Sequence, residues 1–450
     1  MRSYMILSTV DVRAKPNNRE HHLMRHMAAQ GIEVWVVYRR DCRQAGLAEA
    51  LRDALVPWAR VLRENGITFV EVNPPLNHAH GLVDALTADV SADREHGLLR
   101  RCLGRLVAEL GIVKDIATIL ALAFFVWRHG PARVDLAAGL SPWGAAAGLL
   151  LCRLGRVAAV FYEDRDFEPG FMTSPLRRRW AGCLERYGIR RADGGLSIGR
   201  RLATLRREQT GCDLPVVPTG IDLPESMPPV PPPRRRLVYT GHVAPWSGLE
   251  QVMEAMARLR PTAPELTLMV IGDGPPAYIE GLKRLAARLD LQLAVAFTGR
   301  LSYPCVRKVL AEGGIGLALF RPEPLRAFAV PLKVLDYMLA GLPILATQDT
   351  ESAELVERHD AGIVLAYGSD ALTTALPRLL DDRASWLQMA CNGQAAVAQY
   401  DWATLLNREQ AIVETTWRAA LLRQERRRRS RAATRKDHSP LGSDVSERPR

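Results

Sequence analysis

The sequence predicts an α/β protein made of two doubly wound domains that face a central cleft. Short apolar runs alternate with helical stretches over residues 1–222, and the same alternation restarts after residue 236 and continues to residue 400. Strands that alternate with helices pair in parallel through right-handed crossovers. Residues 223–236 hold a proline-rich run, which is stiff and extended and suits a connector between domains.

Length and composition agree with a folded protein of more than one domain. The chain has 450 residues, of which 48% are hydrophobic and 24% charged, and a domain usually takes ~100–200 residues. The seven cysteines are scattered and form no C-x-x-C pair. This pattern argues against a disulfide framework or a zinc site and favours a reducing, cytoplasmic location. The N-terminal apolar run is too short for a signal peptide.

The first series of elements contains five expected strands and one unusually apolar stretch. We expect a helix near residues 20–30 and strands over residues 4–10, 33–38, 67–72, 134–140 and 157–162. The apolar run Ile116–Trp127 has 12 residues, fewer than the ~20 needed to cross a bilayer. It therefore predicts a buried or interfacial helix.

The second series predicts five more strands and a C-terminal helix. Strands are expected within residues 236–241, 266–274, 295–300, 315–320 and 343–347, with helices over 249–260, 278–289 and 306–312. A helix over 401–422 precedes a tail, residues 423–450, with ten Lys or Arg against four Asp or Glu. The tail lacks apolar periodicity and is expected to be disordered and solvated. Nucleic-acid binding would depend on this tail alone, so nucleic acid is not an expected partner.

One further helix, which starts at Pro331 and ends before Gly341, has the features of an anion site. Proline fits the first turn of a helix, and glycine fits the position after its end. Lys333 lies in the first turn, where free backbone N–H groups and the helix dipole attract anions. A buried strand, LPILAT, follows directly.

Five motifs occur in order in the second half: VYTGHVAPWSGLEQVMEA, VIGDGP, FTGRLSYPCVRKVLAEGGIGLALF, PLKVLDYMLAGLPILAT and AGIVL. In this order they resemble the nucleotide-sugar glycosyltransferases of family 4, which have the GT-B fold of two Rossmann-like domains. In the first half, RADGGLSIGRRL and VPTGIDL agree with the same family, so the resemblance covers about residues 1–422.

The resemblance implies a division of labour between the two domains. The C-terminal domain would bind a nucleotide diphosphate sugar as donor, and the N-terminal domain would bind a glycan or lipid-linked acceptor. The family also implies retention at the anomeric carbon. Its members stabilise the leaving diphosphate with side chains and a helix N-terminus rather than with a bound metal ion. We therefore expect no cofactor and no bound metal.

Lys333 and Asp336 are the first candidates for donor binding. By resemblance, Lys333 would contact the phosphates and Asp336 would accept hydrogen bonds from the ribose hydroxyls. The alternative is a solvent-exposed pair at spacing i,i+3, which would stabilise the helix by only ~0.2–0.5 kcal/mol.

Further donor-binding candidates lie in the loops that follow predicted strands: Gly241, His242, Gly272, Asp273, Gly274, Gly299 and Arg300. Glycine permits close approach of the backbone to a ligand, although these glycines would also suit plain strand-to-helix turns.

The sequence departs from the family pattern at three positions. His242 and Ser247 replace a phosphate-binding arginine and lysine, and Phe328 replaces a glutamate. Arg300, Arg321, Arg326 or Lys333 are the available replacement cations, and Arg300 is the favoured one. The lost glutamate leaves inversion by direct displacement open as an alternative to retention.

In the first half, the acidic segment FYEDRDFEPGF follows a predicted strand. A carboxylate in the cleft can take the proton of the attacking acceptor hydroxyl. Asp166 is the candidate base and Glu163 the second choice, against the alternative of ordinary solvated acids. His22 and His26 have a spacing that suits a metal, but no third ligand is evident.

Arginine clusters in residues 177–207 and the apolar stretch Ile116–Trp127 together predict a face for peripheral membrane association, with solvated helix faces as the alternative.

The sequence thus predicts a cytoplasmic glycosyltransferase that acts in bacterial surface polysaccharide or glycolipid synthesis. The alternatives are a catalytically weakened scaffold protein and a sugar-nucleotide epimerase.

Overall fold

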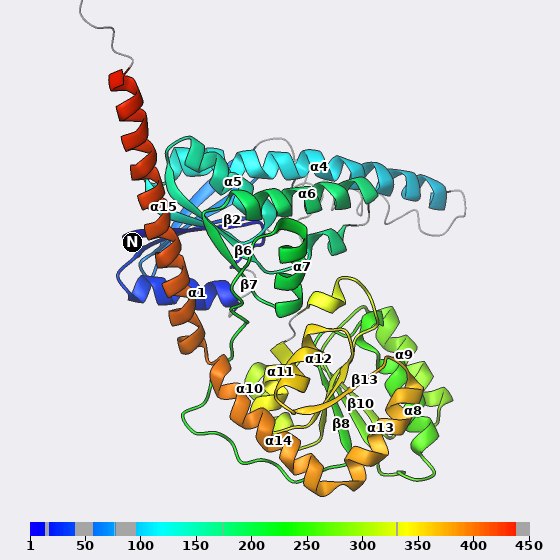
Figure 1. Ribbon diagram of the computed structural model, residues 1–450. Helices are drawn as coiled ribbons and strands as arrows, with labels where there is room; N and C mark the ends of the chain where they lie inside the picture. The colour runs from blue at the N-terminus through cyan, green and yellow to red at the C-terminus, as the bar shows by residue number, and fades with distance from the viewer. Residues whose placement is uncertain are drawn as a thin grey trace, which may run out of the picture.

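The structure, a computed structural model, describes residues 1–13, 18–40, 57–75, 77, 96–172, 174–329 and 332–437. It consists of two α/β domains, one above the other in Figure 1, and each is built on one central sheet. The predicted fold class is confirmed. Within the described ranges, no helix combines the length and the apolar composition that crossing a bilayer requires.

The N-terminal sheet has seven strands in the order β3-β4-β2-β1-β5-β6-β7. Its strands are β1 (Ser3–Ser8), β2 (Glu33–Arg39), β3 (Trp58–Glu64), β4 (Ile67–Asn73), β5 (Val134–Gly139), β6 (Val157–Asp164) and β7 (Gly194–Ser197). All neighbours pair in parallel except β3, which runs antiparallel to β4 at the edge. The five expected strands are confirmed. The sequence did not predict β3 because most of its side chains are exposed and its apolar pattern is therefore weak.

Helices cover both faces of this sheet. In β1, Tyr4 and Ile6 pack with α1 and α15 in one apolar cluster, whereas Met5 and Leu7 pack with α4 and α5 in another. Side chains alternate between the faces of a sheet, so a strand that is covered on both sides must be apolar throughout. The helices of the N-terminal domain are α1 (Arg19–Ala29), α4 (His96–His129), α5 (Pro142–Arg153), α6 (Pro175–Arg191) and α7 (Arg200–Thr210), and α15 (Trp402–Asp437) packs with them.

The C-terminal sheet has six parallel strands in the order β10-β9-β8-β11-β12-β13. They are β8 (Arg236–Thr240), β9 (Thr267–Ile271), β10 (Val295–Gly299), β11 (Ile315–Ala318), β12 (Ile344–Thr347) and β13 (Gly362–Leu365). The helices are α8 (Leu249–Leu259), α9 (Pro276–Arg288), α10 (Tyr303–Ala311), α11 (Leu332–Leu339), α12 (Glu351–Arg358), α13 (Ser369–Asp381) and α14 (Arg383–Val397).

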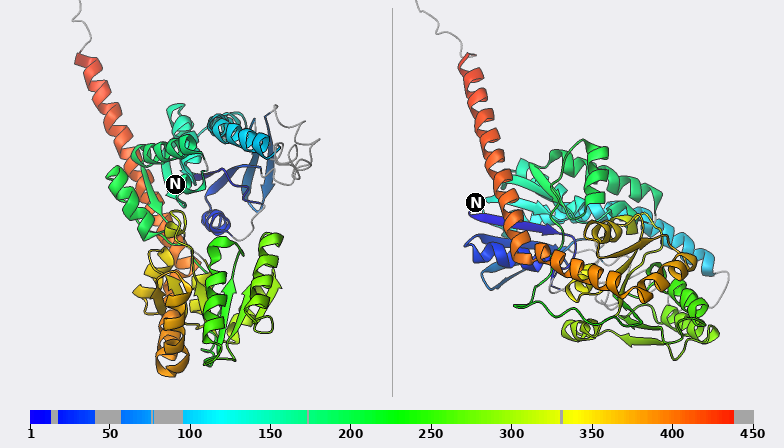
Figure 2. Two further views of the ribbon diagram at one scale, coloured as in Figure 1. Left: turned by 90° about the vertical axis from the view of Figure 1, so that its right-hand side faces the viewer. Right: turned by 60° about the horizontal axis from the view of Figure 1, so that its bottom comes forward.

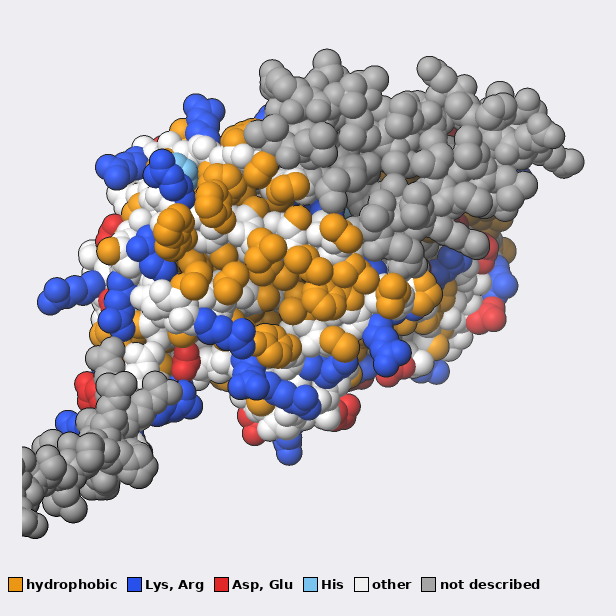
Figure 3. Space-filling model, turned by 90° about the horizontal axis from the view of Figure 1, so that it is seen from above, with side chains coloured by type: hydrophobic (Ala, Val, Ile, Leu, Met, Phe, Trp, Pro, Cys, Tyr) orange, Lys and Arg blue, Asp and Glu red, His pale blue; other side chains and the backbone are white. Residues whose placement is uncertain are grey.

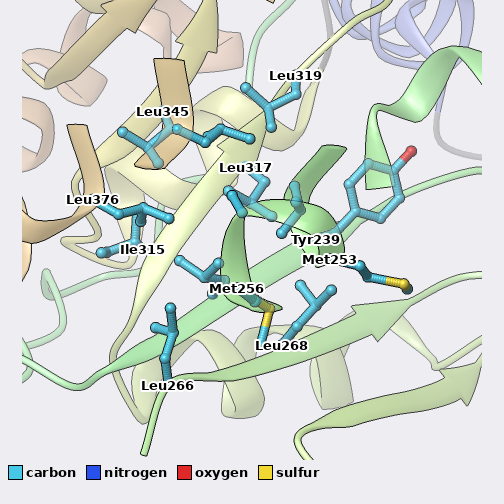
Figure 4. Close-up of a cluster of buried hydrophobic side chains, with 14 of the residues drawn as sticks. Tyr239, Met253, Met256, Leu266, Leu268, Ile315, Leu317, Leu319, Leu345 and Leu376 are labelled. Atoms are coloured by element: carbon cyan, nitrogen blue, oxygen red, sulfur yellow. The ribbon is translucent and has the colours of Figure 1, made fainter. Parts of the chain in front are cut away.

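The core of the C-terminal domain brings strand and helix side chains together beneath the candidate site. Figure 4 shows residues of β8, β9, β11 and β12 in contact with those of α8 and α13. Tyr239 of β8 lies at the edge of this cluster, and its hydroxyl points away from the apolar side chains. That hydroxyl donates a hydrogen bond to the carbonyl oxygen of His242 at 2.6 Å.

Helix α15 returns the chain from the C-terminal domain to the N-terminal one (Figures 1 and 2). Trp402, Leu405 and Val413 are buried in the N-terminal core. The helix continues to Asp437, so the expected end near residue 422 is wrong. Arg423 and Gln424 still bond to the N-terminal domain and hold the helix there. Residues 438–450 lie outside the described residues.

A carboxylate of the C-terminal domain caps a helix of the N-terminal domain. The residue before helix α7, its N-cap, is Gly199, which has no side chain to accept hydrogen bonds from the first turn. The two carboxylate oxygens of Glu351 instead accept hydrogen bonds from the backbone N–H groups of Arg200 and Arg201, at 2.7 and 2.9 Å. Glu351 is buried, so this contact links the two domains through a desolvated, charge-assisted bond.

Replacing Glu351 by alanine should loosen the contact between the domains. A hydrogen bond to a charged group contributes about 1.5–3 kcal/mol, and the first turn of α7 would lose its cap. We expect a lower midpoint of thermal unfolding and a larger radius of gyration in solution scattering. Glu357→Ala, on an exposed position of the same helix, is the control. Equal scattering curves for wild type and Glu351→Ala would contradict this role.

Candidate active site

The strand order of the C-terminal sheet places a crevice between β8 and β11. The chain goes outward from β8 to β9 and β10 on one side, and from β11 to β12 and β13 on the other. At such a switch point the loops after neighbouring strands separate, and ligands of open α/β sheets bind at this edge. The loop after β8 and the loop after β11 therefore define the site.

Lys333 lies above this crevice. Its Nζ atom is 3.9 Å from the ring centre of Tyr239 on β8 and 5.3 Å from that of Phe320, which follows β11. A Cβ atom at Gly241 would lie 3.5 Å from the same nitrogen. Burial and, to a smaller extent, the charge of the nearby Arg326 together lower the pKa of Lys333 to about 7. Pro331, the expected first residue of this helix, lies outside the described residues.

Arg326 provides a second cation at the same edge. Its guanidinium carbon lies 4.1 Å from the ring centre of Trp246, in the loop after β8. Burial lowers the pKa of Arg326, and the carboxylates of Glu323 and Asp166 oppose this effect. A cavity of about 310 Å³ opens beside Arg326, at the ends of β11 and β12. Arg321, another of the replacement cations considered from the sequence, lines the same cavity, whereas Lys333 does not.

The N-terminal domain meets this edge through the segment after β6. The rings of Phe167 and Phe328 are 5.1 Å apart, and they come from different domains. The neighbouring Asp166 is exposed, and it lies close enough to Arg326 for its carboxylate to raise the pKa of that side chain. The structure therefore brings Asp166, Arg326 and Lys333 to the same part of the interdomain contact.

Asp336, the candidate ribose ligand, is bonded within its own domain. Its carboxylate accepts a hydrogen bond of 2.7 Å from the hydroxyl of Tyr303, the first residue of α10. Burial raises the pKa of Asp336, although this bond and Arg307 act in the opposite direction. Asp336 does not form an ion pair with Lys333 in this structure, because Lys333 points to the aromatic rings instead.

The glycines after β8 and β9 allow two backbone segments to touch. A Cβ atom at Gly272 would lie 1.8 Å from the carbonyl oxygen of Gly241, and one at Gly274 would lie 1.9 Å from that of Val243. Gly272 also has a φ of 145°. These contacts account for both glycines by loop packing alone, which was the alternative that the sequence left open.

The remaining donor-binding candidates lie at the same edge of the sheet, where they are more exposed to solvent than Lys333 is. The imidazole of His242 lies 3.9 Å from the carboxylate of Asp273, and more than half of each side chain is exposed. Gly299 ends the edge strand β10, with open space around the position of a Cβ. Arg300 follows it and is exposed. Since β10 is two strands away from β8, Arg326 lies closer to the crevice than the favoured Arg300.

Glu163, the second-choice base, is a structural residue. It is fully buried, and its carboxylate accepts hydrogen bonds from Arg165 at 2.7 and 3.0 Å. The hydroxyl of Tyr4 donates to it as well. The placement of this carboxylate in the cleft was therefore wrong, because the last residues of β6 alternate between the two helical layers.

An ion-pair cluster supports the loop that carries Asp166. Arg206 of α7 is fully buried and bonds Asp164 and Glu185. It also donates to the carbonyl oxygen of Asp166 at 3.4 Å. The sequence did not single out Arg206, because nothing in its arginine-rich neighbourhood distinguishes the one buried side chain from the exposed ones.

Glu168 is a titratable residue that the sequence analysis did not select. Burial raises its pKa well above the usual range, and Asp166 and Glu185 raise it further. This carboxyl group therefore holds its proton more strongly than an ordinary glutamate does.

The histidines of α1 have packing roles. His22 stacks on Trp402 with ring centres 4.5 Å apart, and His26 bonds Gln410 at 2.8 Å. Both partners belong to α15. In the part of the chain that the structure describes, no group of three or more His, Cys, Asp or Glu side chains is arranged to hold a metal ion.

A larger cavity, of about 470 Å³, is lined by residues of both domains. It is bounded by α7, α12 and the start of α15, with Arg200, Arg358 and Tyr400 on its wall. The capping contact of Glu351 belongs to the same wall. This cavity is separate from the crevice between β8 and β11.

Comparison with known proteins agrees with this geometry. Residues 234–382 match the family of glycosyl transferases group 1. The 2-deoxystreptamine glucosyltransferase of Streptomyces kanamyceticus is 25% identical over 236 residues, which is 48% of this chain and 59% of that protein. The chain thus spans little more than half the length of this curated relative.

Solved structures match nearly the whole chain in fold. Sucrose-phosphate synthase of Thermosynechococcus elongatus has a TM-score of 0.67 at 16% identity, covering 93% of this chain and 100% of that one. Anabaena HepE in complex with UDP has a TM-score of 0.62 at 16% identity, covering 92% and 100%. Together these matches show that the chain has the GT-B fold of these two structures and that its residues 234–382 are similar to the glycosyl transferases group 1.

Proposed function

We propose that the chain transfers a sugar from a nucleotide diphosphate sugar to a hydroxyl acceptor. The observation that supports this most directly is the position of Lys333 and Arg326 at the switch point between β8 and β11. HepE was solved with UDP and with UDP-glucose, and the curated relatives include a glucosyltransferase and a mannosyltransferase. These matches do not favour the scaffold or epimerase alternatives.

The proposed reaction needs charge stabilisation and one proton acceptor. The acceptor oxygen bonds to the anomeric carbon while the bond from that carbon to the phosphate oxygen breaks. The diphosphate leaves with the electron pair, and its growing negative charge is stabilised by cations that are already in place. We assign this role to Lys333 and Arg326, and propose that neither a metal nor another cofactor is required.

Asp166 is the proposed acceptor of the hydroxyl proton. It is exposed, it comes from the acceptor domain and it lies close to Arg326 of the donor domain. A hydroxyl group on a bacterial surface glycan or glycolipid is the proposed acceptor. The free cysteines Cys152, Cys183, Cys212, Cys305 and Cys391 support a reducing compartment, which we infer to be the cytoplasm.

A binding and hydrolysis screen of nucleotide sugars tests the proposal. We expect one uridine or guanosine diphosphate sugar to bind and to be hydrolysed slowly without acceptor. The anomeric configuration of the released or transferred sugar, read by NMR, decides between retention and inversion. If no nucleotide binds up to millimolar concentration, the transferase proposal fails.

Lys333 should make nucleotide binding depend on pH. Its pKa of about 7 in the empty site means that the cation is lost above neutral pH, while a bound diphosphate favours the protonated form. We therefore expect the affinity for UDP or GDP to fall towards tenfold per pH unit from pH 7.5 to 9. Isothermal titration measures this slope.

The Lys333→Met variant should bind the same nucleotide weakly and with little pH dependence. Lys283→Met is the control, because Lys283 is an exposed lysine of α9 that pairs with Glu280. A steep slope that persists in Lys333→Met would assign the pH dependence to another group and contradict this role.

Replacing Asp166 by asparagine keeps the shape of the side chain but removes the proton acceptor. We expect turnover with acceptor to fall about 10²–10⁴-fold, with donor affinity within a few-fold of wild type. Asp213→Asn, an exposed acid of the same domain, is the matched control. Equal losses of turnover and donor binding would indicate a structural role for Asp166.

A further inference from the structure

Helix α4 is apolar on two opposite sides. Leu122, Phe125 and Val126 are buried against the N-terminal sheet. On the other side, Val113, Ile116, Leu120, Phe124 and Trp127 follow one another at spacings of three or four residues and are 42–54% exposed. A helix that is apolar all round is normally covered on all sides, so the outer side of α4 lacks the cover that its composition calls for.

The apolar surface continues over the neighbouring helices. Helices α4, α5 and α6 pack against one another on one face of the sheet (Figure 1). Leu154 at the end of α5 and Leu176 and Tyr187 of α6 are exposed. Figure 3 shows apolar side chains gathered on this side of the molecule, with Lys and Arg side chains around them. We call this surface, formed by the eight exposed apolar residues just named, the α4–α6 outer face.

Over residues 111–129 of α4, and over α5 and α6, the exposed charges are all positive. Over residues 111–129, α5 and α6, the acidic residues are Asp115 and Glu185. Both are buried, Asp115 in an ion pair with Arg177 and Glu185 in one with Arg206. The exposed charged side chains are Arg128, Arg153, Arg178, Arg179, Arg190 and Arg191.

This combination of charge and apolar surface distinguishes between occupants. A second copy would place one arginine-rimmed face against another, and like charges would repel. A lipid surface with anionic headgroups attracts the arginines, and its interfacial region accepts Phe, Trp and Leu side chains. We propose that the α4–α6 outer face docks on the surface of an anionic lipid bilayer.

Docking in this way leaves the candidate active site in water. Figure 1 places the C-terminal domain on the side of the N-terminal sheet that faces away from α4. The far end of α15, with Arg426, Arg427 and Arg429 exposed, rises beyond the N-terminal domain (Figures 1 and 2). A helix end with this charge favours anionic headgroups over hydrocarbon.

Sedimentation of the full chain with lipid vesicles tests the proposal. We expect binding to mixed phosphatidylcholine–phosphatidylglycerol vesicles and much weaker binding to pure phosphatidylcholine. The variant Phe124→Ser with Trp127→Ser should bind the mixed vesicles at least about tenfold more weakly, because two aromatic side chains no longer enter the interface. Its thermal unfolding and its nucleotide affinity should stay near those of wild type.

Two further variants keep the test decisive if the serine variant is unstable. Arg128→Glu with Arg179→Glu should weaken binding to the anionic vesicles without changing the apolar surface. Arg426→Gln with Arg427→Gln and Arg429→Gln changes only the charge of the α15 end and should leave most of the binding. Leu293→Ser, an exposed leucine of the other domain, is the matched control for loss of an apolar side chain.

Three results would overturn the proposal. If the serine variant and the Arg128→Glu with Arg179→Glu variant both bind vesicles as strongly as the wild type does, membrane affinity belongs to another part of the chain. The same conclusion follows if only the α15 variant loses binding. Failure of the wild type to bind anionic vesicles would exclude a lipid occupant. In that case, an oligomer that Phe124→Ser with Trp127→Ser dissociates would identify the face as a contact between copies. Because vesicle binding is measured without donor, these outcomes are independent of the transfer reaction.

Discussion

Two buried carboxylates at the end of β6 determine how the N-terminal domain meets its partner domain. Glu163 and Asp164 are neighbours in a strand, so their side chains enter opposite helical layers. Arg165 forms an ion pair with Glu163, and Arg206 forms ion pairs with both Asp164 and Glu185. Removing one partner of such a buried pair leaves an uncompensated charge, which costs about 3–5 kcal/mol. The loop that begins at Arg165 is therefore fixed at its base, and Asp166 and Phe167 are presented to the C-terminal domain.

The alternation of strands and helices could be predicted from the sequence because apolar runs fully buried in a parallel sheet differ clearly from amphipathic helices. Strand β3 could not, since an exposed antiparallel edge strand has little apolar pattern. The length of α15 depends on Arg423 and Gln424, which bond residues far away in the sequence. Lys333 was identified from its helix position. Its neighbours are Tyr239 on β8 and, in the segment between β11 and α11, Phe320 and Arg326, and only the fold brings Lys333 onto the ring of Tyr239.

The surroundings of Lys333 disfavour its positive charge, and a bound anion would favour it. Lys333 lies over aromatic rings and near another cation, and its pKa is lowered to about 7. Perturbed groups of this kind cluster at functional sites, although structural networks also produce them. Here the structural explanation is weak, because Lys333 forms no ion pair with Asp336, the carboxylate nearest to it in its own helix. Cations that are already desolvated and positioned need no reorganisation when charge develops on a leaving group.

The contacts between the domains describe a closed arrangement held at two places. At one, the rings of Phe167 and Phe328 touch beside Asp166 and Arg326. At the other, Glu351 caps α7 across the domain boundary. Both contacts reach the loop that carries Asp166. Phe167 belongs to that loop, and α7 is joined to it through Arg206, which bonds Asp164 and the carbonyl oxygen of Asp166. The buried ion pairs therefore connect the position of Asp166 to both places where the N-terminal domain meets the donor domain.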